Sequence, residues 1–278
     1  IVTSPPYPMI AMWDEQFKGA DPEIADSLLR NDGYAAWERM HKQLDRTWHE
    51  CTRVLRPGGF ICINIGDATR SIDGSFQLYS NHSRIISALQ GLGLTMLPLV
   101  LWRKQTNSPT KFMGSGMLPA GAYVTLEHEY ILIFRKGDKR CFKTDDERKV
   151  RRRSALFWEE RNRWYSDVWD FKGSRQKHQG SRERSGAFPF ELAYRLIHMY
   201  SVQTDVVLDP FAGTGTSMMA AISGGRHSIG IEIEPDLVEY ARNRSTEAVS
   251  GLNELARGRV DQHRDFIEEY AAGKGVPS

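Results

Sequence analysis

Two glycines and one acid in the second half of the chain could bind a flat ligand that carries hydroxyl groups. Gly213 and Gly215 lie in a turn rich in helix- and strand-breaking residues. Without side chains they allow a ligand to approach the backbone closely at the N-terminus of a following helix. Glu232 follows 19 residues after Gly213, about where dinucleotide-binding units place an acid on ribose hydroxyls.

Residues around these glycines distinguish a ligand site from an ordinary tight turn. Gly-x-Gly alone is equally compatible with a structural βα turn. Asp209, Pro210 and Phe211 precede the glycines in register with Glu232, which favours a nucleoside-type ligand. A phosphate-binding P-loop is not expected, because no Gly-Lys-Ser/Thr sequence follows.

A second set of candidate residues opens the chain. Ser4, Pro5, Pro6 and Tyr7 lie in a loop that follows two strand-forming residues, Ile1 and Val2. The prolines fix φ and remove two N–H donors, so carbonyl acceptors, a hydroxyl and a ring remain on a stiff frame. Such a frame suits a flat ligand with an amino group, although a simple proline-rich arm has the same composition. Ile1 resembles the middle of a strand, so residues are expected to precede it.

These residues need an α/β scaffold to position them. Strands are expected at 60–65, 97–102, 127–134, 205–208 and 228–233, and helices at 34–55, 83–92, 216–223 and 235–244. The segment 186–192 is expected to lead into a further helix that runs through Tyr200. Residues 9–32 are expected to form a loop with a short helix that covers the site. Glu127 and His128 lack a second His or Cys at ligand spacing, so they are interpreted as structural and no metal site is predicted.

Composition limits the class of protein. The chain has 278 residues, of which 40% are hydrophobic and 26% charged, as in soluble globular proteins. It shows neither a membrane-length apolar run nor a secretory signal, so a cytoplasmic protein is expected. Cys51, Cys62 and Cys141 are too scattered for a disulfide framework and are expected to be reduced.

One segment carries most of the positive charge. Residues 138–186 hold 15 Lys and Arg against 9 Asp and Glu. Six large rings are interleaved with these cations: Phe157, Trp158, Trp164, Tyr165, Trp169 and Phe171. A solvated basic loop would not need such rings, so the pattern predicts a nucleic-acid surface. The predicted DNA-binding residues are Arg151, Arg152, Arg153, Lys172, Arg175 and Lys177.

Taken together, the motifs resemble those of the β-class DNA amino-methyltransferases, which methylate the exocyclic amine of cytosine or adenine with S-adenosylmethionine. The segment 3–7 is similar to the catalytic motif of that family and 209–216 to its cofactor motif. Phe188 and Pro189 with Glu191-Leu192 are similar to the motif before the cofactor strand. The catalytic motif precedes the cofactor motif, and this order covers nearly the whole chain.

The resemblance implies a Rossmann-like α/β methyltransferase fold with a mostly parallel twisted sheet and circularly permuted motifs. It implies a catalytic half at 1–137, a target-recognition insert at 138–186 and a cofactor-binding half at 187–278. S-adenosyl-L-methionine would contact a set of nine residues: Asp209, Pro210, Phe211, Gly213, Gly215, Thr216, Glu232, Phe188 and Pro189. Ser4 and Pro5 would accept hydrogen bonds from the target amine, Pro6 would stiffen the loop, and Tyr7 would stack on the flipped base.

The resemblance also implies a substrate and partners. Ser4 at the first motif position favours cytosine N4, with adenine N6 as the alternative and RNA as a further one. A cytosine-C5 enzyme would need a cysteine after a proline, which none of the three cysteines provides. Expected partners are duplex DNA, a cognate restriction endonuclease and a second copy of the chain. The expected location is the prokaryotic cytoplasm, at the nucleoid.

Overall fold

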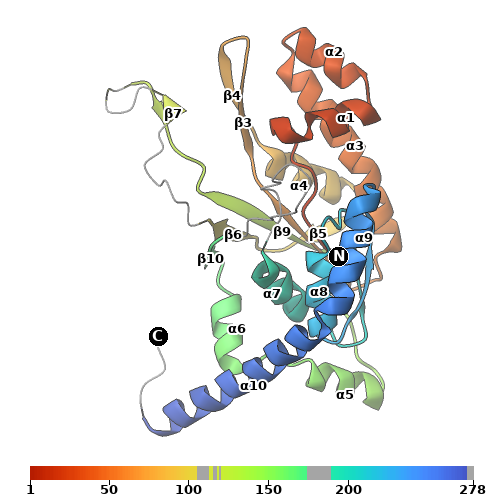
Figure 1. The fold of residues 1–278 in the computed structure, drawn as a ribbon, viewed down its shortest axis with the longest axis vertical. Helices are drawn as coiled ribbons and strands as arrows, with labels where there is room; N and C mark the ends of the chain where they lie inside the picture. Colours follow the sequence, from red (N-terminus) through yellow and green to blue (C-terminus); the bar gives the residue numbers. More distant parts are fainter. Residues whose placement is uncertain (105–112, 115–117, 119, 174–188, 274–278) are drawn as a thin grey trace. The chain divides into compact units, whose positions relative to one another are not determined.

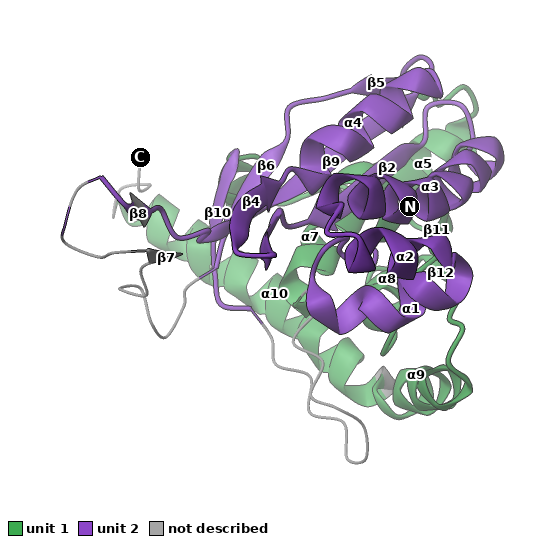
Figure 2. Ribbon diagram, turned by 90° about the horizontal axis from the view of Figure 1, so that it is seen from above, with its two compact units in different colours: residues 1–3, 140–166, 187–278 green, residues 4–139, 167–186 purple. Residues whose placement is uncertain are grey.

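The computed structural model describes residues 1–104, 113–114, 118, 120–173 and 189–273 (Figure 1). The chain forms two compact units, coloured separately in Figure 2. Unit 1 comprises residues 1–3, 140–166 and 187–278, and unit 2 comprises residues 4–139 and 167–186. The segment 138–186 is therefore shared between the units, and its role as a target-recognition insert stays a prediction.

Unit 2 is built on a mixed sheet in the order β2–β9–β6–β10, with β5 also paired to β9. Strands β2, β5 and β6 are all antiparallel to β9, and β10 is parallel to β6. Strand β9 is therefore the one reversed strand among these five. The strands are β2 (Phe60–Ile65), β5 (Leu94–Met96), β6 (Val100–Arg103), β9 (His128–Lys136) and β10 (Val168–Asp170).

The central strands of this sheet form because their residues are β-branched or aromatic and can be buried on both faces. Residues 61–65 of β2 and 131–134 of β9 are fully buried. Two short hairpins extend the unit: β3 (Ala68–Ile72) with β4 (Ser75–Tyr79), and β7 (Met113–Gly114) with β8 (Ala122–Tyr123). Neither the β3–β4 hairpin nor β5 was predicted.

The longest helix of unit 2 is α3 (Gly33–Val54), which Asp32 caps by accepting from the backbone N–H of Ala35. Its buried stripe includes Trp37, Met40, Leu44 and Trp48 at spacings of three and four. The other helices are η1 (Ala11–Trp13), α1 (Asp14–Ala20), α2 (Glu23–Leu29) and α4 (Asn81–Gly91). Residues 9–32 thus form two α-helices instead of a loop with one short helix.

Unit 1 contains the β–loop–α–β segment predicted from Asp209 and the glycines. Strand β11 (Val206–Asp209) pairs in parallel with β12 (His227–Gly230), and α8 (Thr216–Ser223) occupies the predicted residues. The remaining elements are β1 (Val2–Thr3), α5 (Asp145–Arg153), α6 (Trp158–Trp164), α7 (Phe190–Tyr200), α9 (Pro235–Glu247) and α10 (Val249–Ala271). Strand β12 ends two residues before Glu232, so this acid lies in a loop.

Candidate active site

Asp209 is the last residue of β11 and is almost completely buried, with 2% of its surface exposed. Its carboxylate accepts from the hydroxyls of Thr3 and Ser217, each at 2.6 Å, and from the backbone N–H of Phe211 at 3.1 Å. Burial raises the pKa of Asp209, and these hydrogen bonds oppose that rise. The hydroxyl distances are those of hydroxyl–carboxylate bonds, so Thr3 and Ser217 stabilise the ionised form of the Asp209 side chain.

The loop after Asp209 depends on glycine at Gly215, which directly precedes α8. Its φ of 83° lies in the left-handed region, where other residues are strained. A Cβ there would also lie only 3.0 Å from Cβ of Ala241. Both constraints disfavour a side chain at this position.

A hydrogen bond joins Glu232 and Gly213 at the predicted ligand site. The backbone N–H of Gly213 donates to Oε2 of Glu232 at 2.8 Å, and Oε1 of Glu232 accepts from Ile233 and Glu234 backbone N–H groups. A Cβ at Gly213 would meet no atom within 4 Å. A preoriented carboxylate beside open space fits the ribose hydroxyls of a nucleoside ligand. Pro210 and Phe211 line the same loop, half-exposed.

The other predicted cofactor residues are placed only in part. Pro189 is buried and directly precedes α7, and Thr216 is the buried first residue of α8. Phe188 lies outside the described residues, so its predicted contact with the cofactor stays a prediction.

In unit 2, the Ser4–Tyr7 loop contributes to a hydrogen-bond network with β2 and β9. The hydroxyl of Ser4 lies 3.2 Å from that of Tyr7, and Tyr7 donates to Oε2 of Glu129 at 2.8 Å. The amide of Asn64 donates to the Tyr7 hydroxyl at 2.8 Å and to Glu129 at 2.6 Å. Lys104 forms an ion pair with the other oxygen of Glu129. Burial, followed by the charge of Glu129, raises the pKa of Tyr7 well above its usual value.

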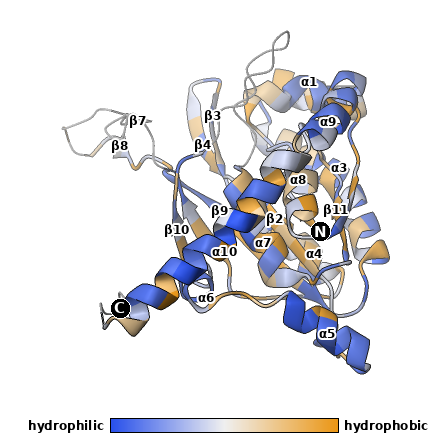
Figure 3. Ribbon diagram, turned by 60° about the horizontal axis from the view of Figure 1, so that its bottom comes forward, coloured by the Kyte–Doolittle hydropathy of each residue, from blue (hydrophilic) through white to orange (hydrophobic). Residues whose placement is uncertain are grey.

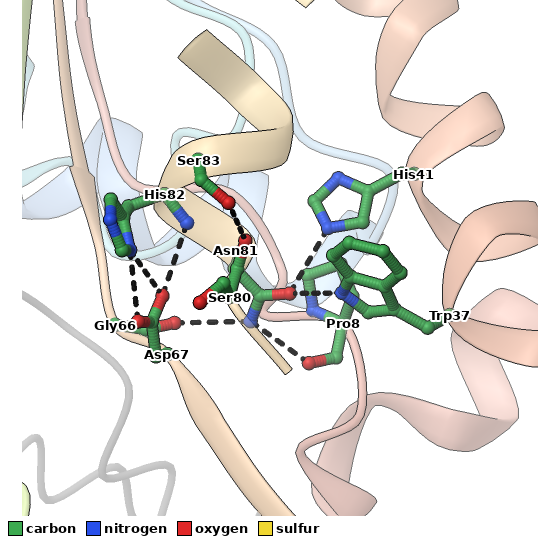
Figure 4. A network of polar contacts seen from close by, with 9 residues as sticks. All are labelled: Pro8, Trp37, His41, Gly66, Asp67, Ser80, Asn81, His82 and Ser83. Atoms are coloured by element: carbon green, nitrogen blue, oxygen red, sulfur yellow. Dashed lines mark hydrogen bonds and ion pairs between the residues drawn. The ribbon is translucent and has the colours of Figure 1, made fainter. Parts of the chain in front are cut away.

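Backbone contacts fix the position of this network. A Cβ at Gly66 would lie 3.1 Å from the ring of Tyr7 and 3.2 Å from Cγ of Glu129, so a side chain here would push against both residues. Figure 4 shows Asn81 donating to the backbone carbonyls of Gly66 and Pro8, at 3.1 and 3.0 Å. A single amide thus holds the carbonyl of Pro8, which follows Tyr7, and the carbonyl of Gly66.

The Asn81 amide is itself fully hydrogen-bonded. Its oxygen accepts from Nε1 of Trp37 at 2.7 Å and lies 3.0 Å from Nε2 of His41. Because this oxygen cannot donate, Nε2 of His41 must carry a proton. Burial lowers the pKa of His41 to about 4, so the ring is neutral and structural. Met9, which follows Pro8 in the chain, has φ of 67°. This value is strained for a residue other than glycine, so the packing around Met9 must stabilise it.

The basic and aromatic segment differs from its prediction. Trp164 and Trp169 are 2% and 1% exposed, so these rings form core and are not available to bases. Phe157 stacks on His263 of α10, with ring centroids 3.8 Å apart. The interpretation of the six rings as a nucleic-acid surface is therefore wrong for Trp164 and Trp169, and it stays a prediction for Phe157, which is half-buried. Trp158 and Tyr165 are each about half-exposed.

The predicted DNA-binding cations are exposed where the structure describes them. Arg151, Arg152 and Arg153 form the last turn of α5, which is mostly hydrophilic in Figure 3. Lys172 is also exposed. Arg175 and Lys177 lie outside the described residues. The role of all six in DNA binding stays a prediction.

Sequence reasoning missed Thr3, Asn64, Lys104 and Glu129. A signal existed for two of them: Asn64 is polar within the apolar run FICINI, and Glu129 precedes the apolar run YILIF. A polar residue among buried strand residues needs a partner. The register pairs Asn64 with Ile131, so Glu129 is its diagonal neighbour on the same face.

None of the described helices is long and apolar enough to span a membrane.

Comparison with known proteins identifies relatives along most of the chain. Type II methyltransferase M.MthZI of Methanothermobacter thermautotrophicus is 54% identical over 97% of this chain and 77% of its own length. Type II methyltransferase M.MjaI of Methanocaldococcus jannaschii is 49% identical over 85% and 81%, respectively.

Solved structures show the same fold. TTHA0409 of Thermus thermophilus, crystallised with S-adenosyl-L-methionine, is 31% identical with a TM-score of 0.68, covering 90% of this chain and 86% of its own. The cytosine-N4-specific PvuII DNA methyltransferase has a TM-score of 0.56 at 17% identity, over 92% and 85% of the chains, which shows the fold alone. The predicted methyltransferase fold is thereby confirmed. The N6_N4_Mtase family, described as DNA methylase, matches residues 1–243, and the chain belongs to this family.

Proposed function

We propose that this chain transfers a methyl group from S-adenosyl-L-methionine to the exocyclic N4 amine of a cytosine in duplex DNA. The observation that carries the proposal is the hydrogen bonding of Ser4. The Nδ2 group of Asn64 donates to the Tyr7 hydroxyl, and that hydroxyl donates its single proton to Oε2 of Glu129. Ser4 then donates its own proton to Tyr7, which leaves its lone pairs to accept from an amine.

Such an acceptor increases the reactivity of the amine. The nitrogen lone pair of an exocyclic amine is conjugated with the base ring and is a poor nucleophile. Hydrogen bonds from its protons to Ser4 and to the Pro5 carbonyl would turn this lone pair toward the methyl donor, with Pro6 holding the loop rigid and Tyr7 stacking on the base. Catalysis would then consist mainly of positioning and electrostatics.

The methyl donor fits the residues around Asp209. A buried carboxylate at this position suits the ammonium group of a methionine moiety, and Glu232 suits the ribose hydroxyls. Pro210, Phe211, Gly213, Gly215 and Thr216 would form the wall of this site. When bound, the donor supplies an electrophilic methyl group on a sulfonium. Asp209→Ala should abolish its binding, which calorimetric titration with S-adenosyl-L-methionine would measure.

The DNA side of the proposal involves a localised positive charge. The amine lies inside the duplex, so the target nucleotide would be flipped out of the stack at a cost of a few kcal/mol. Arg151, Arg152 and Arg153 would contact phosphates and fix the orientation of the duplex. The names of the Type II relatives support a role in a restriction–modification system with a cognate endonuclease.

The test is methyl transfer from labelled S-adenosyl-L-methionine to mixed-sequence duplex DNA, followed by digestion and separation of nucleosides. N4-methylcytosine is the expected product. N6-methyladenine would refute the cytosine assignment and establish the alternative that the family also contains. Ser4→Ala should retain donor binding while methyl transfer collapses, and loss of donor binding in that variant would contradict the role given to Ser4.

A further inference from the structure

We propose that Glu129 is the proton acceptor of a relay that runs from the target amine through Ser4 and Tyr7. The proposal rests on the proposed function, since it assigns the route by which the methylated amine loses its extra proton. Three groups form an unbroken chain: the Ser4 hydroxyl, the Tyr7 hydroxyl 3.2 Å away, and Oε2 of Glu129 a further 2.8 Å away.

The direction of every proton in this chain is determined by its neighbours. Asn64 uses its two amide hydrogens on Tyr7 and on Glu129, so both oxygens receive a bond from the same donor. The proton of Tyr7 can only point to the carboxylate. The proton of Ser4 then points to Tyr7, so all the hydroxyl protons point from the loop toward Glu129.

The step balances without any further reactant. As the new N–C bond forms and the S–C bond breaks, the amine nitrogen becomes cationic. It gives one proton to the Ser4 oxygen, the original Ser4 proton moves to Tyr7, and the Tyr7 proton moves to Glu129. Both hydroxyls are regenerated, the amine becomes neutral, and the carboxylate becomes a carboxylic acid.

The acidity of the methylated amine drives the transfer toward Glu129. A ring amine that has been methylated and remains protonated has lost its conjugation with the ring, which makes it a strong acid. A carboxylate paired with Lys104 therefore still accepts its proton. The raised pKa of Tyr7 keeps that residue neutral, so it passes a proton on without ionising.

Burial explains why a relay is needed. Glu129 is 8% exposed and Asn64 is 1% exposed, so the carboxylate end of the network has little contact with bulk water, whereas Ser4 and Tyr7 are half-buried. The Lys104 side chain is one-third exposed. After transfer, the proton can leave Glu129 on the side of Lys104, where water is available.

The experiment measures single-turnover methyl transfer with DNA and S-adenosyl-L-methionine for wild type, Glu129→Gln, Tyr7→Phe and the double variant. General acid–base groups contribute about 10²- to 10⁴-fold, so each single variant should be slowed by about 10²-fold or more. Because the residues act in one chain, the double variant should be no slower than the slower single variant. Binding of S-adenosyl-L-methionine should be unchanged in all of them.

Glutamine also separates a relay from a positioning role. Its side-chain oxygen can still accept the Tyr7 hydrogen bond, so Glu129→Gln would be close to normal if Glu129 only oriented Tyr7. Glu129→Asp keeps the carboxylate and should be faster than Glu129→Gln. The matched control is Glu127→Gln. Glu127 directly precedes β9 and pairs with Arg103, so the rate of this variant should equal that of wild type.

Three outcomes would overturn the relay: a Glu129→Gln rate within threefold of wild type, single effects that multiply in the double variant, or an equal loss in Glu127→Gln. Retained donor binding and an unchanged melting temperature in Glu129→Gln show that a slow rate is not misfolding. The nucleoside product of the wild-type enzyme tests the proposed function separately, because an adenine product would refute cytosine specificity without affecting the relay.

Discussion

Replacing Thr3 by valine tests how the Asp209 anion is held. Valine has nearly the shape of threonine and favours the strand, so the change removes the hydroxyl with little change in packing. Thr3 is 1% exposed and its hydroxyl lies 2.6 Å from Oδ1 of Asp209. A hydrogen bond to a charged group contributes about 1.5–3 kcal/mol, so Thr3→Val should destabilise the protein by about 2 kcal/mol.

Thermal unfolding would measure this loss. For a chain of this size 1 kcal/mol corresponds to about 2–4 °C, so the melting temperature should fall by about 4–8 °C. Thr69→Val on the β3–β4 hairpin is the control, with an expected change of no more than about 0.5 kcal/mol. A Thr3→Val melting temperature within 1 °C of wild type would refute a stabilising hydrogen bond between this hydroxyl and a charged Asp209.

The pH dependence gives a second, independent measure. The folded-state pKa of Asp209 is raised above its unfolded value, so its protonated form contributes stability that is present below the unfolded pKa. This contribution is lost as pH rises through the folded pKa. Thr3 stabilises the ionised form, so the deficit of Thr3→Val should be largest above the folded pKa. It should shrink to about 1 kcal/mol, the value of a neutral hydrogen bond, as pH falls. A stability deficit of Thr3→Val that does not change with pH would contradict the inference that Thr3 stabilises ionised Asp209 more than protonated Asp209.

Three further predictions concern the loop and the basic helix. Glu232→Gln should weaken S-adenosyl-L-methionine binding by about tenfold or more in calorimetric titration, because an NH₂ group replaces one carboxylate oxygen that accepts from backbone N–H groups; unchanged affinity would remove Glu232 from the site. Gly215→Ala should lower the free energy of unfolding by about 1–2 kcal/mol, whereas Gly258→Ala in the open interior of α10 should raise it by up to about 1 kcal/mol; equal effects would contradict the strain argument. Replacing 151–153 by glutamine should reduce the salt dependence of DNA binding by about 0.9 in slope for each phosphate that is no longer neutralised, and an unchanged slope would place the DNA surface elsewhere.

Elements with a strong local pattern were predictable from the sequence. Helix α8 and strand β2 occupy the predicted residues, and α3 differs by one residue at each end. Each combines clear apolar periodicity with breakers or caps at its boundaries. The β3–β4 hairpin was missed although the sequence carries a signal for it: Asp73-Gly74 joins the two strands, with φ of 48° and 73°, and Asp-Gly is typical of a two-residue hairpin turn.

The composition of the site was only partly predictable. The spacing of Gly213 and Glu232 indicated that both belong to one ligand site, because a βαβ unit brings the ends of adjacent strands together, but it did not predict the hydrogen bond between them. Glu129 was missed because its partners Asn64 and Tyr7 are 65 and 122 residues distant. Such a contact follows from strand register, which no local pattern in the sequence specifies. Trp164 and Trp169 were misassigned because charged residues surround them in the sequence, and such neighbours do not indicate that a ring is buried.

The hydrogen bond between Thr3 and Asp209 joins residues 206 positions apart, and this separation has a consequence during biosynthesis. At about 5–20 residues per second, a ribosome needs about 10–40 s to reach Asp209 after it has made Thr3. Throughout that interval strand β1 has no Asp209 to bind. The hydrogen bond that holds β1 to Asp209 therefore forms only after all of unit 2 and helices α5, α6 and α7 have been synthesised.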